Sequence, residues 1–391
     1  MEINLFFEPV DPEIYQPDDD APRKRIGDLI QVYSKHGNFP DLKDTDIAIV
    51  GVSEDRMSTD NYGSGKAPDV IRKHLYRLFR NGNRLNIADL GNIPRGHSIE
   101  DTYFALSSVT EQLLSSNILP VILGGSQDLT YAQYKGYGNL GQIINLLVVD
   151  PMFDLGKHDD ALTSGSFLSK IILHQPNYLF NYTNLGYQSY YVDPDAVRLM
   201  QKLYFDAYRI GNVRNDMEEV EPIVRNSDML SIDISAVRFA DAPGNNNATP
   251  NGFYGEEICR IMRYAGISDK LTSVGIYEYN PSLDIREQTA KLIAQMIWYF
   301  IEGYYKRTKD YPVKENEDFL KFLVRIKDQV DEIVFYKSRK SERWWMEIPV
   351  ESDLKERYER HYMVPCSFHD YKIACENNIP ERWWQFYQKL V

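Results

Sequence analysis

Residues 143–154 read IINLLVVDPMFD, an almost entirely apolar run that ends in two acids. A short apolar run bounded by polar residues is typical of a strand that is buried on both faces of a parallel sheet. Asp150 follows the predicted strand directly, and Asp154 lies four residues later. Because a buried carboxylate is costly unless it is paired or bound to a cation, these two acids are the first candidates for a functional site.

Short apolar segments and longer amphipathic segments alternate along the chain on both sides of this stretch. The predicted strands are residues 46–52, 86–90, 119–123, 143–149, 229–234 and 271–277. The predicted helices are residues 67–79, 98–116, 168–173, 255–265 and 289–305. This alternation predicts a three-layer α/β/α domain with a mainly parallel sheet, in which ligands bind beyond the carboxyl ends of the strands.

The sequence changes in character after residue 305, so we predict an α/β domain at residues 1–305 and an appended segment at residues 306–391. Residues 319–336 carry apolar side chains at helical spacing, which predicts an amphipathic helix and a mainly helical extension. Four of the five tryptophans lie in this segment, at positions 344, 345, 383 and 384. We expect this Trp-rich extension to pack against the first domain as a lid or buttress. The alternative is a protein partner or self-association, because Trp and Arg are enriched at contact surfaces.

Composition and charge exclude several functions. The 391 residues have a formal net charge of −13, which argues against a nucleic-acid partner. No apolar stretch approaches the roughly 20 residues that span a bilayer, and the first residues lack the pattern of a secretory signal. Three cysteines without a Cys-x-x-Cys pair predict neither a disulfide framework nor a zinc site. We therefore expect a cytoplasmic protein without a membrane span.

Two more predicted strands end in residues of interest. Asp233 lies in LSIDIS at residues 230–235, near the end of a predicted strand, and Gly124 and Gly125 follow the strand at residues 119–123. Three acids at one edge of a sheet suit a hard divalent cation, although helix capping or an ion pair explains each acid taken alone. The two glycines either let the backbone approach a ligand or form a turn with positive φ.

Taken in order, these motifs resemble the ureohydrolase superfamily of arginases, agmatinases and formiminoglutamases over residues 46–305. The matching stretches are GKAPDVIR at 65–72, DLGN at 89–92, GGSQD at 124–128, DPMFD at 150–154, SIDIS at 231–235, APG at 242–244 and YEYNP at 277–281. The resemblance implies the family's fold and a pair of manganese ions with a bridging hydroxide, which attacks the carbon of a guanidinium or amidine group. It also implies an oligomer, since the family's proteins often form rings of three or six subunits.

The resemblance assigns candidate roles to further residues. Ser164 and Gly165 correspond to the family's substrate loop, and Gly125 and Ser126 are expected to line the same ligand site. Glu278 matches a family glutamate that faces the cationic nitrogen of the substrate. The alternative for Glu278 is an ion pair with a neighbouring arginine.

The six ligand positions of the family, two histidines and four aspartates, are only partly kept. They correspond to Gln127, Asp150, Met152, Asp154, Asp233 and Ser235. Gln127, Met152 and Ser235 thus replace both histidines and one aspartate, and a thioether or a neutral hydroxyl is a poor ligand for a hard ion. We therefore expect no metal or one divalent ion (Mn²⁺ or Mg²⁺), held by Gln127 and the three aspartates, and no binuclear manganese site. His158 is a further candidate ligand, with a surface position as the alternative.

Two functions remain open. The replaced ligands favour a non-catalytic relative, a pseudoenzyme that keeps the scaffold and binds a partner or a small ligand. The alternative is a metal-dependent hydrolase of C–N bonds in linear amidines or guanidines, of the agmatinase, arginase or formimidoylglutamase type, with a single or altered metal site. In that enzyme Asp154 and Glu278 would be the catalytic residues.

Overall fold

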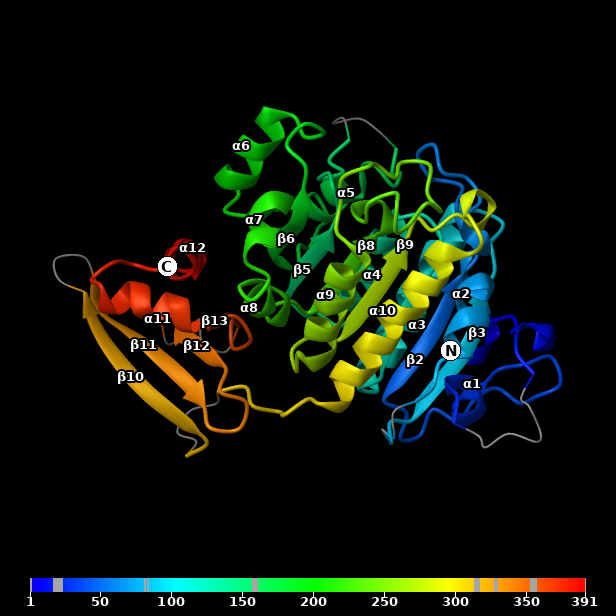
Figure 1. The fold of residues 1–391 in the computed structure, drawn as a ribbon, viewed down its shortest axis with the longest axis horizontal. Helices are drawn as coiled ribbons and strands as arrows, with labels where there is room; N and C mark the ends of the chain where they lie inside the picture. Colours follow the sequence, from blue (N-terminus) through cyan, green and yellow to red (C-terminus); the bar gives the residue numbers. More distant parts are fainter. Residues whose placement is uncertain are drawn as a thin grey trace.

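The computed structural model of the chain describes residues 2–16, 24–80, 82, 84–156, 161–312, 317–326, 330–351 and 357–390. Figure 1 shows a large α/β domain beside a smaller part, which is built from the last strands and helices of the chain. We refer to the described part of residues 317–390 as the C-terminal module. Among the described residues, no helix has both the length and the apolar character needed to cross a bilayer.

The centre of the first domain is a sheet in which the structure places nine of the described strands. Their order is β1-β3-β2-β4-β9-β8-β5-β6-β7, and neighbouring strands pair in parallel. The bounds are β1 (Gln31–Val32), β2 (Ile47–Val52), β3 (Ile87–Ile93), β4 (Leu119–Leu123), β5 (Ile144–Val149), β6 (Leu179–Tyr187), β7 (Asp206–Arg209), β8 (Met229–Asp233) and β9 (Ser273–Tyr277). The prediction of a mainly parallel sheet is confirmed.

Helices cover both faces of this sheet (Figure 1). Their bounds are α1 (Ile26–Leu29), α2 (Ala67–Leu75), α3 (Ile99–Ser115), α4 (Leu129–Asn139), α5 (Phe167–Ile172), α6 (Pro194–Lys202), α7 (Ile210–Asn215), α8 (Val220–Arg225), α9 (Gly255–Ile267) and α10 (Gln288–Tyr305). In β2, Ile47 and Ile49 belong to a hydrophobic core with α2, α9 and α10, while Ala48 and Val50 belong to a second core with α3 and α4. Because successive side chains of a strand point to opposite faces, β2 is buried on both, and the three-layer arrangement is confirmed.

The sequence did not predict the elements between residues 179 and 225. β6 reads LFNYTNLGY, and its buried polar residues interrupt the apolar pattern of a buried strand. The neighbouring strand β7 satisfies two of them: Asn181 Nδ2 donates to Asp206 Oδ2 at 2.6 Å, and the Thr183 hydroxyl lies 3.3 Å from the same oxygen. A strand whose polar groups are satisfied across the sheet is difficult to recognise from its own sequence.

The prediction of an amphipathic helix at residues 319–336 is wrong. The C-terminal module contains an antiparallel sheet in the order β10-β11-β12-β13, which packs against two helices. The bounds are β10 (Phe319–Ile326), β11 (Val330–Ser338), β12 (Trp344–Glu347), β13 (Met363–Cys366), α11 (Phe368–Cys375) and α12 (Glu381–Leu390). The ring of Phe322 in β10 lies 5.2 Å from that of Trp344 and 5.5 Å from that of Tyr371, between centroids. Packing of aromatic residues on the sheet therefore overrides the helical spacing of the local sequence.

The C-terminal module contacts the amino ends of the central strands. Asp228, which directly precedes β8, accepts a hydrogen bond from the Arg360 guanidinium at 2.6 Å. Lys389 of α12 donates to Asn181 Oδ1, near the start of β6, at 2.5 Å. These contacts lie at the edge of the sheet opposite its carboxyl ends, so the module supports the first domain as a buttress and does not form a lid. The division into two domains after residue 305 stays a prediction.

Most tryptophans of the C-terminal extension form the core of this module and are not on its surface. Trp344, Trp345 and Trp383 are buried, whereas Trp384 is 44% exposed. The guanidinium of Arg225 in α8 lies 4.3 Å from the centre of the Trp345 ring, which joins the module to the first domain. A partner or self-association through the extension stays a prediction.

Candidate functional site

The candidate site lies at the carboxyl ends of four neighbouring strands, β4, β9, β8 and β5. Asp233 at the end of β8 lies opposite Tyr277 of β9, and the residue before Asp233 lies opposite Val149 of β5. Asp150 and Glu278 follow these partners directly, so they leave the sheet at the level of Asp233. The parallel register thus brings the acids of three separate motifs to one edge.

Burial and mutual repulsion raise the pKa of each carboxyl in this cluster. Burial raises the pKa of Asp154 to about 7, with the charges of Asp233 and Glu278 adding to the effect. Burial also raises the pKa of Asp150 well above its usual range, together with the charge of Asp154. The pKa of Asp233 is raised by burial and then by the charge of Asp150, and that of Glu278 by burial and then by the charge of Asp233. The four acids therefore share one region of low dielectric.

Within the described residues, no basic side chain neutralises these four acids. Their partners there are backbone N–H groups, neutral side chains and one another. Two buried atoms of the site, Asp150 Oδ2 and Gln127 Nε2, have no hydrogen-bond partner in that part of the chain. Buried carboxylates are stable when they are protonated or when a cation binds, so the oxygen donors fit a divalent metal. No three His, Cys, Asp or Glu side chains of the described chain already have the geometry of a metal site.

Glu278 is held by donors from the loops that follow β2 and β4. Asn61 Nδ2 donates to Oε2 at 2.7 Å, the Gln127 backbone N–H donates to Oε1 at 2.8 Å, and the Ser58 hydroxyl lies 3.3 Å from Oε2. No arginine of the described residues pairs with Glu278, so the alternative of an arginine partner finds no support there. Glu278 and Asp154 both have positive φ, +64° and +49°. A non-glycine residue in this region stores about 1–3 kcal/mol of strain, and such residues are concentrated at functional sites.

Two of the three replaced ligand positions, Met152 and Ser235, orient neighbouring aspartates through the backbone. The Met152 N–H donates to Asp150 Oδ1 at 2.6 Å, and the Met152 side chain is exposed. Ser235 is buried, and its backbone N–H donates to Asp233 Oδ1 at 2.7 Å. The role of Met152 therefore requires no particular side chain, whereas the Ser235 hydroxyl also bonds to Asp233 and lowers its pKa, which burial raises.

The predicted serines take part in the loops around the acids. The Ser126 hydroxyl donates to the carboxylate of Asp128. Ser164 Oγ accepts from the Thr59 backbone N–H at 2.9 Å, which joins the predicted substrate loop to the loop after β2. Their contact with a ligand stays a prediction, and His158 lies outside the described residues.

The glycines after β4 form the turn that the sequence analysis gave as one of two explanations. Gly124 and Gly125 have φ values of +80° and +78°. A Cβ on Gly125 would lie 2.6 Å from the Glu54 carbonyl oxygen, so a larger residue does not fit there. A Cβ on Gly165 would lie 3.5 Å from Thr59 Oγ1, an ordinary contact, so the structure gives no steric reason for this glycine.

Two asparagines that no predicted motif contains fix the backbone of Glu278. Asn61 and Asn245 each donate from Nδ2 to the Glu278 carbonyl oxygen, at 2.8 Å and 2.7 Å. Asn245 belongs to an asparagine-rich loop at residues 244–247, directly after the matched APG stretch, and this was the available signal. Asn61 lies in the loop between β2 and α2, without a comparable motif.

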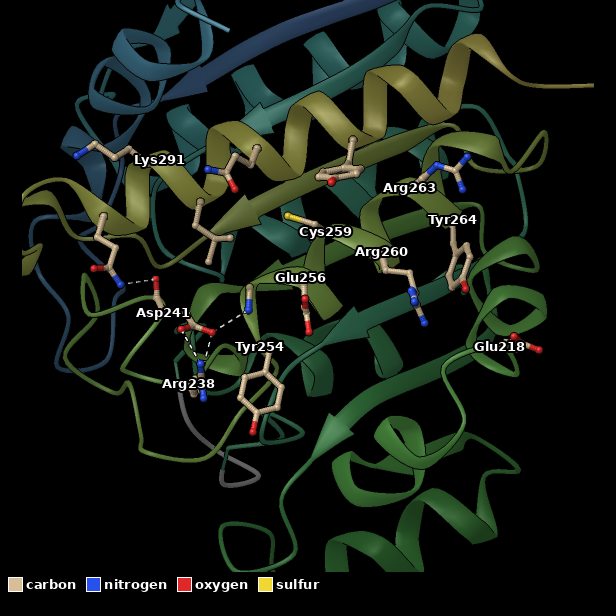
Figure 2. Close-up of a pocket in the computed structure, with 15 residues that line it drawn as sticks. Glu218, Arg238, Asp241, Tyr254, Glu256, Cys259, Arg260, Arg263, Tyr264 and Lys291 are labelled. Atoms are coloured by element: carbon tan, nitrogen blue, oxygen red, sulfur yellow. Dashed lines mark hydrogen bonds and ion pairs between the residues drawn. The ribbon is translucent and has the colours of Figure 1, made fainter.

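A groove of about 1190 Å³ lies away from the acids, along the outer side of α9 and α10 (Figure 2). None of the four acids lines it. Figure 2 shows Arg238 and Asp241 pointing toward each other, and their side chains form two hydrogen bonds at 2.8 Å and 3.0 Å. Asp241 also accepts from the Gly255 N–H at 2.9 Å, at the start of α9. The charges of Arg238 and Asp241 thus stabilise the start of α9 and pair with each other. We therefore assign the functional site to the four acids at the strand ends and not to this groove.

Comparison with known proteins identifies the class to which this fold and site belong. A family model described as Arginase family matches residues 45–302, which is more than half of the chain. The chain therefore belongs to the arginase family, and the predicted resemblance to the ureohydrolase superfamily is confirmed.

Two bacterial formimidoylglutamases are among the similar curated proteins. That of Staphylococcus haemolyticus (strain JCSC1435) is 24% identical over 282 residues, which cover 68% of this chain and 88% of the relative. That of Lysinibacillus sphaericus (strain C3-41) is 25% identical over 267 residues, which cover 64% of this chain and 82% of the relative.

Solved structures of formimidoylglutamases share the fold. That of Bacillus subtilis subsp. subtilis str. 168 has a TM-score of 0.65 at 19% identity, covering 75% of this chain and 95% of its own. The Trypanosoma cruzi formiminoglutamase with Mn²⁺₂ has a TM-score of 0.66 at 18% identity, covering 73% of this chain and 100% of its own. At these identities the likeness shows a common fold.

The Trypanosoma cruzi protein corrects our expectation about the metal. It was solved with Mn²⁺₂, on a fold that this chain shares as a member of the arginase family. The expectation of no metal or one ion, without a binuclear manganese site, is therefore contradicted. That expectation rested on three replaced side chains, whereas the described residues keep the buried acids and nothing among them shows that the metal site is lost.

Proposed function

We propose that this protein is a metal-dependent hydrolase that cleaves a C–N bond of a linear amidine, in the manner that the name formimidoylglutamase indicates for its relatives. The observation that carries the proposal is the cluster of three buried acids and the half-buried Asp154 at the carboxyl ends of adjacent strands, without a basic partner among the described residues. Such a cluster attracts both a divalent cation and a cationic substrate.

The residues of the chain supply oxygen donors for the metal. Asp150, Asp154 and Asp233 would bind manganese with their carboxylates, and Gln127 with its amide. Carboxylate and amide oxygens are ligands that suit Mn²⁺. When bound, a divalent metal polarises the substrate and lowers the pKa of water.

Glu278 binds and orients the substrate in this proposal. Asn61 and the Gln127 N–H fix both oxygens of its carboxyl group, so the group has a defined orientation. A fixed carboxylate that pairs with the amidinium group holds the amidine carbon in one orientation for attack. The backbone bonds from Asn61 and Asn245 to the Glu278 carbonyl oxygen keep this strained residue in place.

The reaction adds water to the amidine carbon and breaks the bond to the leaving nitrogen. One proton of the attacking water passes to the Asp154 carboxylate and from there to the leaving amine. The second proton of the water follows to the same nitrogen as the carbonyl forms. The water oxygen stays on the carbon, so the formimidoyl group leaves as neutral formamide and the amine departs as an ammonium, which carries the positive charge of the amidinium. Transfer of this kind contributes about 10²–10⁴-fold to a rate.

Product release from three substrates tests the proposal. The chain is incubated with excess Mn²⁺ and formiminoglutamate, agmatine or arginine, and formamide and urea are measured. We expect formamide from formiminoglutamate, and a loss of at least ~10³-fold in Asp154→Ala. Glu256→Ala, which removes an exposed acid at the start of α9, is the matched control and keeps the wild-type rate.

A non-catalytic binding protein is the second candidate, because Gln127, Met152 and Ser235 replace family ligands. It predicts that none of the three substrates is turned over, even when elemental analysis shows manganese in the purified protein. That result would contradict the hydrolase. Formamide release that depends on Asp154 would contradict the second candidate.

A further inference from the structure

The outer edge of β10 has no pairing strand in the described part of the chain. β10 comes first in the order β10-β11-β12-β13, so only its inner edge pairs, with β11. Figure 1 shows it at the outer border of the C-terminal module, on the side away from the α/β domain. Outward N–H and C=O groups of an edge strand are available to another strand.

The two faces of β10 differ in exposure. Phe322 and Val324 pack on the core of the module. Lys321, Leu323 and Arg325 point to the other face and are exposed, Leu323 to 58%. The exposed face therefore presents an apolar side chain with a cation two residues away on each side.

We propose that β10 binds an extended segment of a protein partner in which acidic and apolar residues alternate. Strand addition pairs the backbone of that segment with the outer edge of β10, and side chains in directly opposite positions set the specificity. An acid opposite Lys321, an apolar residue opposite Leu323 and an acid opposite Arg325 complement the exposed face. The surface lies away from the four acids of the candidate site, so a bound partner leaves that site accessible.

A second copy of the same strand does not meet these requirements. β10 reads FLKFLVRI and contains no acid, so pairing of two copies within the bounds of the strand places no acid opposite Lys321 or Arg325. An antiparallel pair centred on Leu323 places Lys321 opposite Arg325, and like charges in this position are destabilising. The two cations therefore select an acidic partner over self-association.

β10 shares two features with a protective edge, the basic side chains of Lys321 and Arg325 and a bulge in its ladder with β11 between Val324 and Ile326, but it differs from one in its length and composition. Protective edges are short or carry proline, and basic side chains discourage further pairing. β10 is eight residues long, contains neither Pro nor Gly, and exposes Leu323 between its cations. Its length and its exposed leucine are features of a binding strand.

Fluorescence anisotropy with the full chain tests the proposal. The probe is a fluorescein-labelled nonapeptide in which Glu and Val alternate, and the comparison peptide carries Lys in place of each Glu. We expect the Glu/Val peptide to bind at least ~10-fold more tightly than the Lys/Val peptide, and Lys321→Glu with Arg325→Glu to weaken its binding by at least ~10-fold. The matched control, Lys35→Glu with Lys43→Glu, makes the same charge change at two exposed lysines of the first domain and leaves binding unchanged.

Hydrogen exchange on the unaltered chain gives a second measurement that depends on no variant. We expect the bound Glu/Val peptide to slow the exchange of amide protons in β10. Equal binding of the two peptides, unchanged binding by the double variant, or protection confined to other strands overturns the proposal. A dimer of the chain that Lys321→Glu with Arg325→Glu abolishes also overturns it, since the edge then pairs with a second copy.

Discussion

The two ends of β8 each carry a buried aspartate, and the two aspartates have opposite electrostatic surroundings. Asp228 directly precedes the strand, and Asp233 closes it. Burial by itself would raise the pKa of Asp228, but the charges of Lys270 and Arg360 outweigh burial and lower it. Burial raises the pKa of Asp233, and the charge of Asp150 raises it further.

This comparison shows that charged partners, rather than burial, distinguish the surroundings of the two aspartates. At the amino end of the sheet, the buried aspartate has a cationic partner. The ion pair between Asp228 and Arg360 joins the C-terminal module to the first domain. The carboxyl end has acids without cations among the described residues. Strongly perturbed carboxyls that lack a structural partner are typical of sites that bind a ligand.

The largest expected effect is the loss of turnover in Asp233→Ala. We expect kcat/KM for formiminoglutamate with Mn²⁺ to fall at least ~10³-fold. The free energy of unfolding of the metal-free chain should stay the same or rise, because the variant removes a buried carboxyl whose pKa is raised by burial and by the charge of Asp150. Activity and denaturant unfolding in EDTA measure the two effects. A metal-free variant that is clearly less stable would mean that Asp233 is structural, like Asp228.

The opposite result is expected at the other end of the strand, in Asp228→Ala. Removal of one partner from a buried ion pair costs about 3–5 kcal/mol, and the exposure of Arg360 places this case at the lower end, about 3 kcal/mol. Urea unfolding measures the change, and turnover per folded molecule should match the wild type. Glu256→Ala, at an exposed position, should change stability by less than about 0.5 kcal/mol. A loss in Asp228→Ala of under about 1 kcal/mol would remove the contrast between the two aspartates.

Manganese should stabilise the wild-type chain by binding to the acids at the carboxyl end of the sheet, without any contribution from Asp228. At a free Mn²⁺ concentration of about 100 times Kd, binding to the folded state contributes about 2.7 kcal/mol. Thermal unfolding with and without Mn²⁺ should show this gain in the wild type and in Asp228→Ala. An equal gain in Asp233→Ala would place the bound metal elsewhere.

The smallest expected effect is a pH dependence at the amino end. Burial lowers the pKa of His361 to about 3, and the charge of Lys270 adds to this effect. The unfolded chain protonates this histidine near pH 6.5, whereas the folded chain does not, so its contribution to stability is complete above pH 6.5 and falls as the pH drops toward 3. Between pH 7 and 5.5 the loss is about 1 kcal/mol.

Urea unfolding at several pH values checks this contribution. We expect His361→Asn to have a flatter pH profile than the wild type between pH 7 and 5.5. His36→Asn, which changes an exposed histidine, should keep the wild-type profile. Parallel profiles for wild type and His361→Asn would show that the protonation of this histidine is not linked to folding.

The central sheet could be predicted from sequence because each of its central strands is an apolar run that decides its own structure. The run at residues 119–123 coincides with β4, for example. The strands β10 and β11 could not be predicted in this way. Their apolar residues fit both a helical and a strand period, and contacts with Trp344 and Tyr371, further along the chain, decide between them.

The acids of the site could be predicted because each follows a strand and belongs to a motif in a fixed order. Asn61 could not, because it reaches Glu278 across 217 positions of the chain through a loop without regular structure. The expectation about the metal failed for a different reason. It considered only which ligands, such as Met152, are replaced. It left out the acids that remain close together in the folded site, whose charges help to raise the pKa of Asp154.

The contacts of the C-terminal module join positions that are far apart in the order of synthesis. Lys389 and Asn181 are separated by 208 positions, and Arg360 and Asp228 by 132. During synthesis, the amino ends of β6 and β8 therefore lack the partners Lys389 and Arg360 until the ribosome has made the intervening residues. We expect the last steps of folding to be slow and to rely on chaperones that protect this unfinished border of the sheet.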